Sequence, residues 1–123
     1  MDFKEFYVFN NQGKSNCVIR TFCKIFNEEY NDIENDLCLI AKRIGCASFN
    51  DIIVFETYMK KRNVNAITYG KNVKIKDLNL DEGRYIIFCW DKKDYYHMVP
   101  IIDGVLFDKN DKSLELYVIT IYK

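Results

Sequence analysis

The spacing of the hydrophobic positions changes near the middle of the chain. Up to about residue 62 the apolar residues recur every three or four positions, which is typical of amphipathic helices. From residue 65 onward, short runs rich in β-branched and aromatic residues dominate, which is typical of strands. Helices first and strands second predict an α+β fold, with N-terminal helices packed on a C-terminal antiparallel β-sheet.

Polar residues mark the ends of two predicted helices. Ser15 or Asn16 can cap the first helix, because each offers a side-chain oxygen to the exposed N–H groups. Asn31 followed by Glu34 resembles a capping box at the start of the second helix. Gly45 is expected to end that helix, because glycine adopts the left-handed conformation common at helix C-termini.

A third helix is predicted to begin at Asn50 or Asp51. Its apolar positions continue to Met59, and it ends in the basic run at 60–62. Positive charge is favourable at a helix C-terminus, so the run is interpreted as a solvated helix end.

Six strand-like segments follow the helices. Asp103-Gly104 is the strongest hairpin signal in the chain, because both residues tolerate the positive φ angles of a tight turn. The predicted segments are 65–70, 72–78, 83–90, 95–102, 105–108 and 114–122.

Length, charge and composition narrow the class of protein. A chain of 123 residues with 49% hydrophobic residues predicts one domain, residues 1–123, with a real core. The formal net charge is zero, which argues against nucleic acid or an anionic membrane as a partner. No apolar run approaches the length of about 20 residues that crosses a membrane, and the start MDFKEFYVFN lacks a signal-peptide layout. We therefore expect a cytoplasmic protein.

The cysteines indicate reduced thiols. There are five, an odd number, and no CxxC pair occurs, so a disulfide framework or a zinc site is not expected. We predict no metal and no cofactor. The five are Cys17, Cys23, Cys38, Cys46 and Cys89.

One of these thiols has the setting of a nucleophile. Cys17 follows the polar loop NNQGKSN at a predicted helix start, where helix-terminal N–H groups favour a thiolate. The general base that such a thiol needs can only be His97, because the chain has no other histidine. Each residue also has a structural alternative, namely a buried helix cysteine and a strand histidine without a catalytic role.

The predicted hairpin supplies a third group. With a two-residue turn at Asp103-Gly104, His97 and Asp108 project to the same side of the hairpin, on a diagonal that side chains can bridge. Asn110 projects to that side as well. Pro100 interrupts the ladder, and a register shift there would replace Asp108 by Asp111 or a neighbour.

Amide groups near Cys17 can stabilise the oxyanion that forms when a thiolate attacks a carbonyl. The backbone N–H of Cys17 is one candidate donor, and the side chain of Gln12 is a second. Asn16 is a rival for the second position.

The order NQGKSNC, YYHMVPIIDG and GVLFD resembles the papain-like cysteine peptidases, and more narrowly small papain-like proteins of bacteria and phages. The resemblance implies a minimal papain-like fold in which Cys17 is the nucleophile, His97 the acid and base, and Asp108 the orienting residue. It also implies an oxyanion role for Gln12. The chain departs from papain at Val18, where papain has tryptophan, and its Gln-to-Cys spacing is one residue shorter.

The expected function is that of a cysteine-dependent hydrolase of a peptide, isopeptide or related amide bond, with a protein or peptide substrate. Acyl transfer and deamidation use the same groups and are not separated by the sequence. A non-catalytic papain-like protein that binds a host or partner protein is the main alternative. Trp90 is a weak candidate for lining a substrate groove. The sequence does not indicate an oligomeric state.

Overall fold

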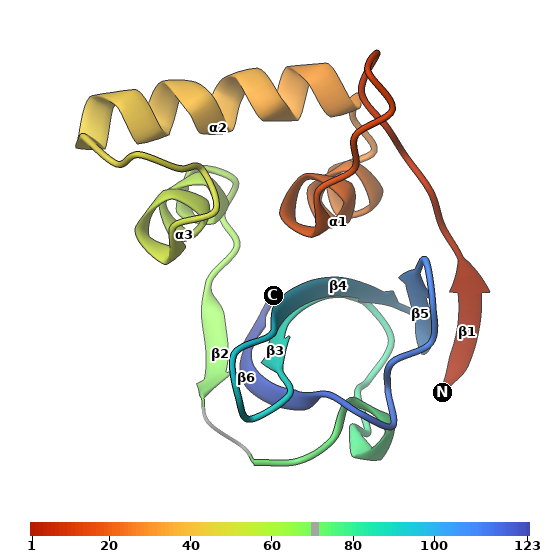
Figure 1. Ribbon diagram of the computed structural model, residues 1–123. Coiled ribbons are helices and arrows are strands. Elements are labelled where there is room, and N and C mark those ends of the chain that lie inside the picture. The colour runs from red at the N-terminus through yellow and green to blue at the C-terminus, as the bar shows by residue number, and fades with distance from the viewer. Residues whose placement is uncertain (70–71) are drawn as a thin grey trace. The chain divides into compact units, whose positions relative to one another are not determined.

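The computed structural model describes residues 1–69 and 72–123, and it has the predicted α+β fold (Figure 1). The chain divides into two compact units. One, called the strand unit below, contains Met1–Tyr7 and Ala66–Lys123, and the other, the helical unit, contains 8–65. That residues 1–123 behave as a single domain stays a prediction.

Three helices form the helical unit: α1 (Cys17–Phe26), α2 (Tyr30–Ile44) and α3 (Ile52–Lys61). Two of the predicted caps are present, because the Asn16 side chain accepts two N–H groups of α1 and the Asp51 side chain accepts one of α3. In the described residues no helix is long and apolar enough to cross a membrane.

The predicted start of α2 is wrong by two residues, although its predicted end is confirmed. The helix begins at Tyr30, and Glu29 is the N-cap residue. No side chain caps this N-terminus, so Asn31 and Glu34 form no capping box. Tyr30 is buried, and extending the helix to include it keeps its ring in the core. Gly45 ends α2 with a φ of 88°, as predicted.

The strand unit is a six-stranded sheet within the described part of the chain, in the order β1-β5-β4-β3-β6-β2. The expected all-antiparallel sheet is corrected in one place, because β1 lies parallel to β5 at one edge. The strands are β1 (Asp2–Glu5), β2 (Ala66–Tyr69), β3 (Arg84–Trp90), β4 (Tyr96–Ile102), β5 (Val105–Asp108) and β6 (Tyr117–Tyr122).

One predicted strand is a different element. Within 72–78 the chain forms a short 3₁₀ helix, η1 (Ile75–Asp77), whose Ile75 N–H donates to the Leu116 carbonyl at 3.0 Å. The segment keeps some strand-like pairing, because Lys74 forms an isolated antiparallel bridge with Tyr117 and the Val118 N–H donates to the Val73 carbonyl at 2.8 Å. Ile75 is almost fully buried in the core. The predicted last strand begins only at Tyr117, and Gly70, the end of the predicted segment 65–70, lies outside the described residues.

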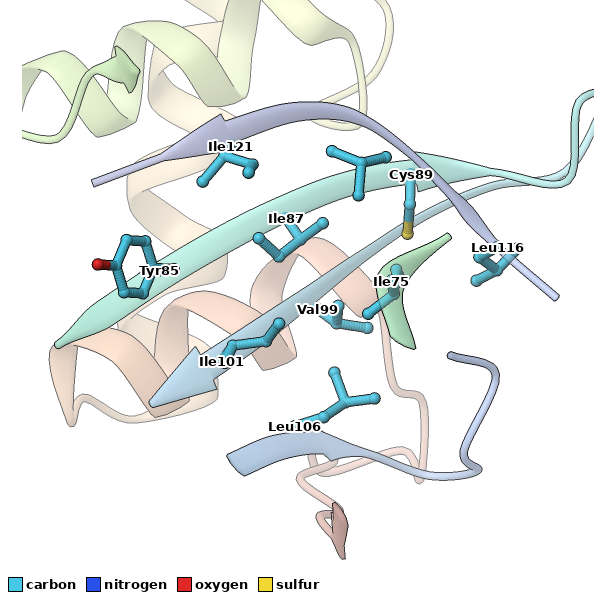
Figure 2. Packing of buried hydrophobic residues seen from close by; sticks show 10 residues of the cluster. Ile75, Tyr85, Ile87, Cys89, Val99, Ile101, Leu106, Leu116 and Ile121 are labelled. Atoms are coloured by element: carbon cyan, nitrogen blue, oxygen red, sulfur yellow. The ribbon is translucent and has the colours of Figure 1, made fainter. Parts of the chain in front are cut away.

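One hydrophobic cluster of the strand unit lies on a single face of the sheet. Side chains from β3, β4, β5 and β6 point toward one another and toward the side chain of η1 (Figure 2). The cluster consists of Ile75, Tyr85, Ile87, Cys89, Val99, Ile101, Leu106, Leu116, Val118 and Ile121. This packing fixes which side of β4 faces the core, and therefore which way His97 points.

Candidate active site

The hairpin of β4 and β5 positions the predicted histidine and carboxylate. Asp103 and Gly104 have φ angles of 48° and 78°, the conformation of a type I′ turn. Ile101 pairs with Leu106, which is the register that a two-residue turn predicts. His97 lies directly opposite Cys89 of the core cluster, so it projects to the core face of the sheet.

His97 and Asp108 form a buried pair. Nε2 of the imidazole lies 2.7 Å from Oδ2 of the carboxylate, and the two side chains are 7% and 4% exposed. The second carboxylate oxygen accepts the backbone N–H of Lys109 at 2.7 Å. An ionised carboxylate only accepts hydrogen bonds, so the proton of this pair lies on Nε2. Asp108 therefore fixes both the ring orientation and the tautomer of His97.

The other ring nitrogen faces Tyr95. The Tyr95 hydroxyl lies 3.3 Å from Nδ1, and the two rings are stacked with centroids 5.6 Å apart. Lys112 donates to the same hydroxyl at 3.0 Å, and this bond is the main reason that the pKa of Lys112 is raised. Because Nε2 carries the proton, Nδ1 is the nitrogen that can accept one from an acid.

The hairpin has the predicted register on the turn side of Pro100. Ile101 pairs with Leu106 and Ile102 with Val105, and the pairing of β4 with β5 stops before Pro100, which lies opposite Ile86 in β3. The alternatives to Asp108 take other places: Asn110 is exposed, and the Asp111 carboxylate accepts the N–H and the hydroxyl of Ser113. The structure thus brings His97 together with Asp108.

Cys17 occupies the first position of α1 in the helical unit. The side-chain oxygen of Asn16 accepts hydrogen bonds from the backbone N–H groups of Val18 at 2.9 Å and Ile19 at 3.2 Å. The polar loop therefore ends in a helix N-cap. Cys17 is neither sealed in the core nor fully exposed. This location agrees with the predicted helix start and gives the thiol the partial access that a nucleophile requires.

The two candidate oxyanion amides differ in their surroundings. Asn16 uses its side-chain oxygen in the cap, and its side-chain nitrogen donates to Asn50 at 2.9 Å, so this amide is already engaged in holding the loop. Gln12 is exposed in the turn between Asn10 and Lys14, where its backbone N–H donates to the Asn10 side chain. Of the two side chains, Gln12 is the better placed to turn toward a ligand.

The remaining cysteines lack this combination of features. Burial raises the pKa of the Cys23 thiol to about 11, and Cys89 donates its thiol proton to the His97 carbonyl inside the core. Cys38 is exposed, but partial desolvation and then the Glu34 carboxylate raise its pKa. Cys46 lies in the loop after α2. All five remain thiols.

Sequence reasoning missed Arg20. It is 4% exposed, and its guanidinium donates to the Ser15 hydroxyl at 3.0 Å. Arg20 lies three residues after Cys17 on α1, and residues at this spacing are neighbours on a helix surface. An arginine among the apolar positions of an amphipathic helix was the available signal.

Trp90 lies on the other face of the sheet from His97. It pairs with Tyr96, and the two rings stack with centroids 5.7 Å apart, while the neighbouring pair Cys89 and His97 faces the core. Strand alternation therefore separates Trp90 from the histidine within this unit.

The described residues contain no group of three or more His, Cys, Asp or Glu side chains able to hold a metal ion.

Comparisons of the chain with protein-family models, with curated proteins and with solved structures give no match.

Proposed function

We propose that this protein is a cysteine-dependent hydrolase that cleaves a peptide, isopeptide or related amide bond. Cys17 would be the nucleophile, His97 the general base and acid, and Asp108 the group that orients the imidazole. The observation that carries the proposal is the buried 2.7 Å contact between His97 Nε2 and Asp108 Oδ2. A histidine held by a carboxylate in one tautomer is the arrangement that cysteine and serine hydrolases require of their base.

The proposed reaction has two stages. The Cys17 sulfur, its proton transferred to Nδ1 of His97, attacks the carbonyl carbon, and the imidazolium then protonates the departing amine. A thioester remains on Cys17. Water gives a proton to His97 and attacks the thioester, and the acid product leaves as Cys17 recovers its proton.

Four groups of the helical unit support the charged states of this cycle. The start of α1 and the nearby Arg20 favour a thiolate at Cys17, because both supply positive potential. The backbone N–H of Cys17 and the Gln12 amide are the proposed donors to the oxyanion. Within this proposal the chain is a minimal, cytoplasmic papain-like enzyme, and its partner is a protein or peptide substrate.

The test is site-specific labelling of the full chain with iodoacetamide or a vinyl sulfone at about pH 6, read by peptide mass spectrometry. Cys38 is an internal control, because it is exposed and its pKa is raised. We expect Cys17 to react at least about tenfold faster than Cys38, as expected for a thiolate paired with an imidazolium.

His97→Ala and Asp108→Asn test whether the reactivity depends on the pair. Each variant should slow the labelling of Cys17 strongly while leaving Cys38 unchanged, provided that circular dichroism shows a folded protein. Equal labelling rates of Cys17 and Cys38 would overturn the proposal in favour of a non-catalytic binding protein. An unchanged labelling rate of Cys17 in the His97→Ala variant would do the same.

A further inference from the structure

Tyr95 connects the buried pair of His97 and Asp108 to Lys112. The Tyr95 hydroxyl lies 3.3 Å from Nδ1 of His97, and the two rings stack at an interplanar angle of 25°. Nζ of Lys112 donates to the same hydroxyl at 3.0 Å and lies 4.5 Å from the centroid of the Tyr95 ring. The four side chains therefore form one chain of hydrogen bonds that runs from Lys112 to Asp108.

Two short turns hold the backbones of Tyr95 and Lys112. The Asp91 carboxylate accepts the backbone N–H groups of Lys93 at 2.8 Å and Tyr95 at 3.1 Å. The Asp91 N–H in turn donates to the Tyr95 carbonyl at 3.1 Å, and the Lys112 carbonyl accepts the Leu116 N–H at 3.1 Å. The fold itself thus presents the tyrosine hydroxyl to the imidazole.

The hydroxyl proton of Tyr95 is directed toward His97. The Lys112 ammonium only donates hydrogen bonds, so the Tyr95 oxygen accepts from it, and the hydroxyl proton remains for a second partner. Nδ1 is that partner, because Asp108 keeps the ring proton on Nε2. The charge of Lys112 favours the same arrangement, since it repels a second positive charge on the imidazole.

We propose that Tyr95 and Lys112 together restrain His97 as a base. The inference rests on the proposed function, in which Nδ1 takes the proton of Cys17. Nδ1 has one lone pair, so it cannot take that proton while it accepts the Tyr95 hydroxyl. The proposed cycle begins only when this bond breaks, and Tyr95 can turn toward solvent because it is 38% exposed. Tyr95 acts through the imidazole and is a positioning residue.

The first experiment measures the rate at which iodoacetamide labels Cys17 in the full chain at about pH 6. Tyr95→Phe keeps the ring but removes the hydroxyl, so Cys17 should react about fivefold faster than in the wild type. Lys112→Met should raise the rate by about threefold, whereas Lys112→Arg, which keeps a charged donor, should not raise it. Tyr96→Phe and Lys93→Met are the matched controls and should leave the rate unchanged. Circular dichroism confirms that each variant is folded.

The second experiment observes the imidazole directly by long-range ¹H–¹⁵N correlation spectroscopy. His97 is the only histidine of the sequence, so its ring signals need no assignment. At about pH 8, where the ring is neutral, the wild type should carry the proton on Nε2. Tyr95→Phe should shift the Nδ1 signal downfield, because that nitrogen loses its hydrogen bond. The Nε2 signal should stay in place, because the contact with Asp108 remains.

The outcomes distinguish this inference from the proposed hydrolase. An unchanged Nδ1 signal in Tyr95→Phe overturns the inference. A Cys17 labelling rate that is unchanged or lower in Tyr95→Phe, but still depends on His97, overturns it as well, and the proposed function survives both results. Labelling of Cys17 that does not depend on His97 refutes the proposed function itself, and with it the restraint, whatever the Nδ1 signal shows.

Discussion

His97 in the strand unit and Tyr58 in the helical unit are both almost fully buried, but their polar atoms have different surroundings. Both nitrogens of His97 have polar neighbours, and its partner Asp108 is itself held by a backbone N–H. The Tyr58 hydroxyl has no hydrogen-bond partner within the described residues. Similar burial therefore has opposite consequences. Removing the Asp108 carboxylate leaves the buried His97 imidazole without that hydrogen bond, whereas removing the Tyr58 hydroxyl removes a buried polar group that has no partner in the described residues.

The largest effect is expected from Asp108→Ala. Removing one member of a buried pair leaves the other desolvated without its partner, so the free energy of unfolding should fall by about 3–5 kcal/mol. Denaturation by urea, followed by circular dichroism, measures this. The control is Asp94→Ala at an exposed loop position, which should change stability by less than about 0.5 kcal/mol. A loss below about 1 kcal/mol for Asp108→Ala would show that the pair does not stabilise the fold.

The next effect concerns alkaline pH. Burial raises the pKa of Tyr58 from 10.0 to about 12, so between these values the unfolded chain loses the phenol proton while the folded chain keeps it. The contribution of Tyr58 to stability is therefore complete below pH 10 and is lost toward pH 12, by about 2–3 kcal/mol. Urea titrations of the wild type and of Tyr58→Phe at pH 9 and 12 isolate this difference. Parallel losses in both proteins would contradict it.

A smaller effect separates two buried tyrosines of the helical unit at neutral pH. Tyr30 and Tyr58 are 4% and 3% exposed. Burial is the main reason that the pKa of Tyr30 is raised, and a hydrogen bond with the Asn16 backbone opposes the rise. Tyr30→Phe should lower the free energy of unfolding by about 1 kcal/mol, whereas Tyr58→Phe should leave it unchanged or increase it. Equal losses would show that the Tyr58 hydroxyl has a partner after all.

The smallest effect on stability is expected from Tyr95→Phe, a substitution at the partly exposed side chain that stacks on His97. Tyr95→Phe keeps the ring that stacks on His97 but removes the hydroxyl that Lys112 contacts. Stability should change by less than about 0.5 kcal/mol, because Tyr95 is 38% exposed and water replaces the lost bond. The pKa of Lys112 should fall toward its ordinary value, which ¹³C NMR of the lysine side chain measures. Tyr96→Phe is the matched control and should leave that pKa unchanged.

Features encoded by neighbouring residues were predictable. The cap at Asn16, the C-terminal Gly45 and the turn at Asp103-Gly104 each depend on a few consecutive residues, and each is present in the structure. The turn also sets the register of the hairpin next to it, and for this reason the sequence predicts a contact between His97 and Asp108.

Features that depend on distant residues were not predictable. The parallel pair of β1 and β5 joins residues about a hundred positions apart, and no local pattern announces it. Residues 75–77 form a 3₁₀ helix because Ile75 enters the core beside Leu116, and α2 starts early because Tyr30 is buried. In both cases burial in the tertiary structure outweighed a local signal.

The sequence alone determined the helices-then-strands order, the helix start at Cys17 and the side of the hairpin on which His97 and Asp108 lie. Each follows from backbone preferences and side-chain alternation within one stretch of chain. Only the tertiary structure decided that the Tyr58 hydroxyl is buried without a hydrogen-bond partner among the described residues, while Asp108 meets His97 in a buried pair. Whether a buried polar atom is satisfied depends on atoms contributed by other elements, and their positions are set only when those elements pack.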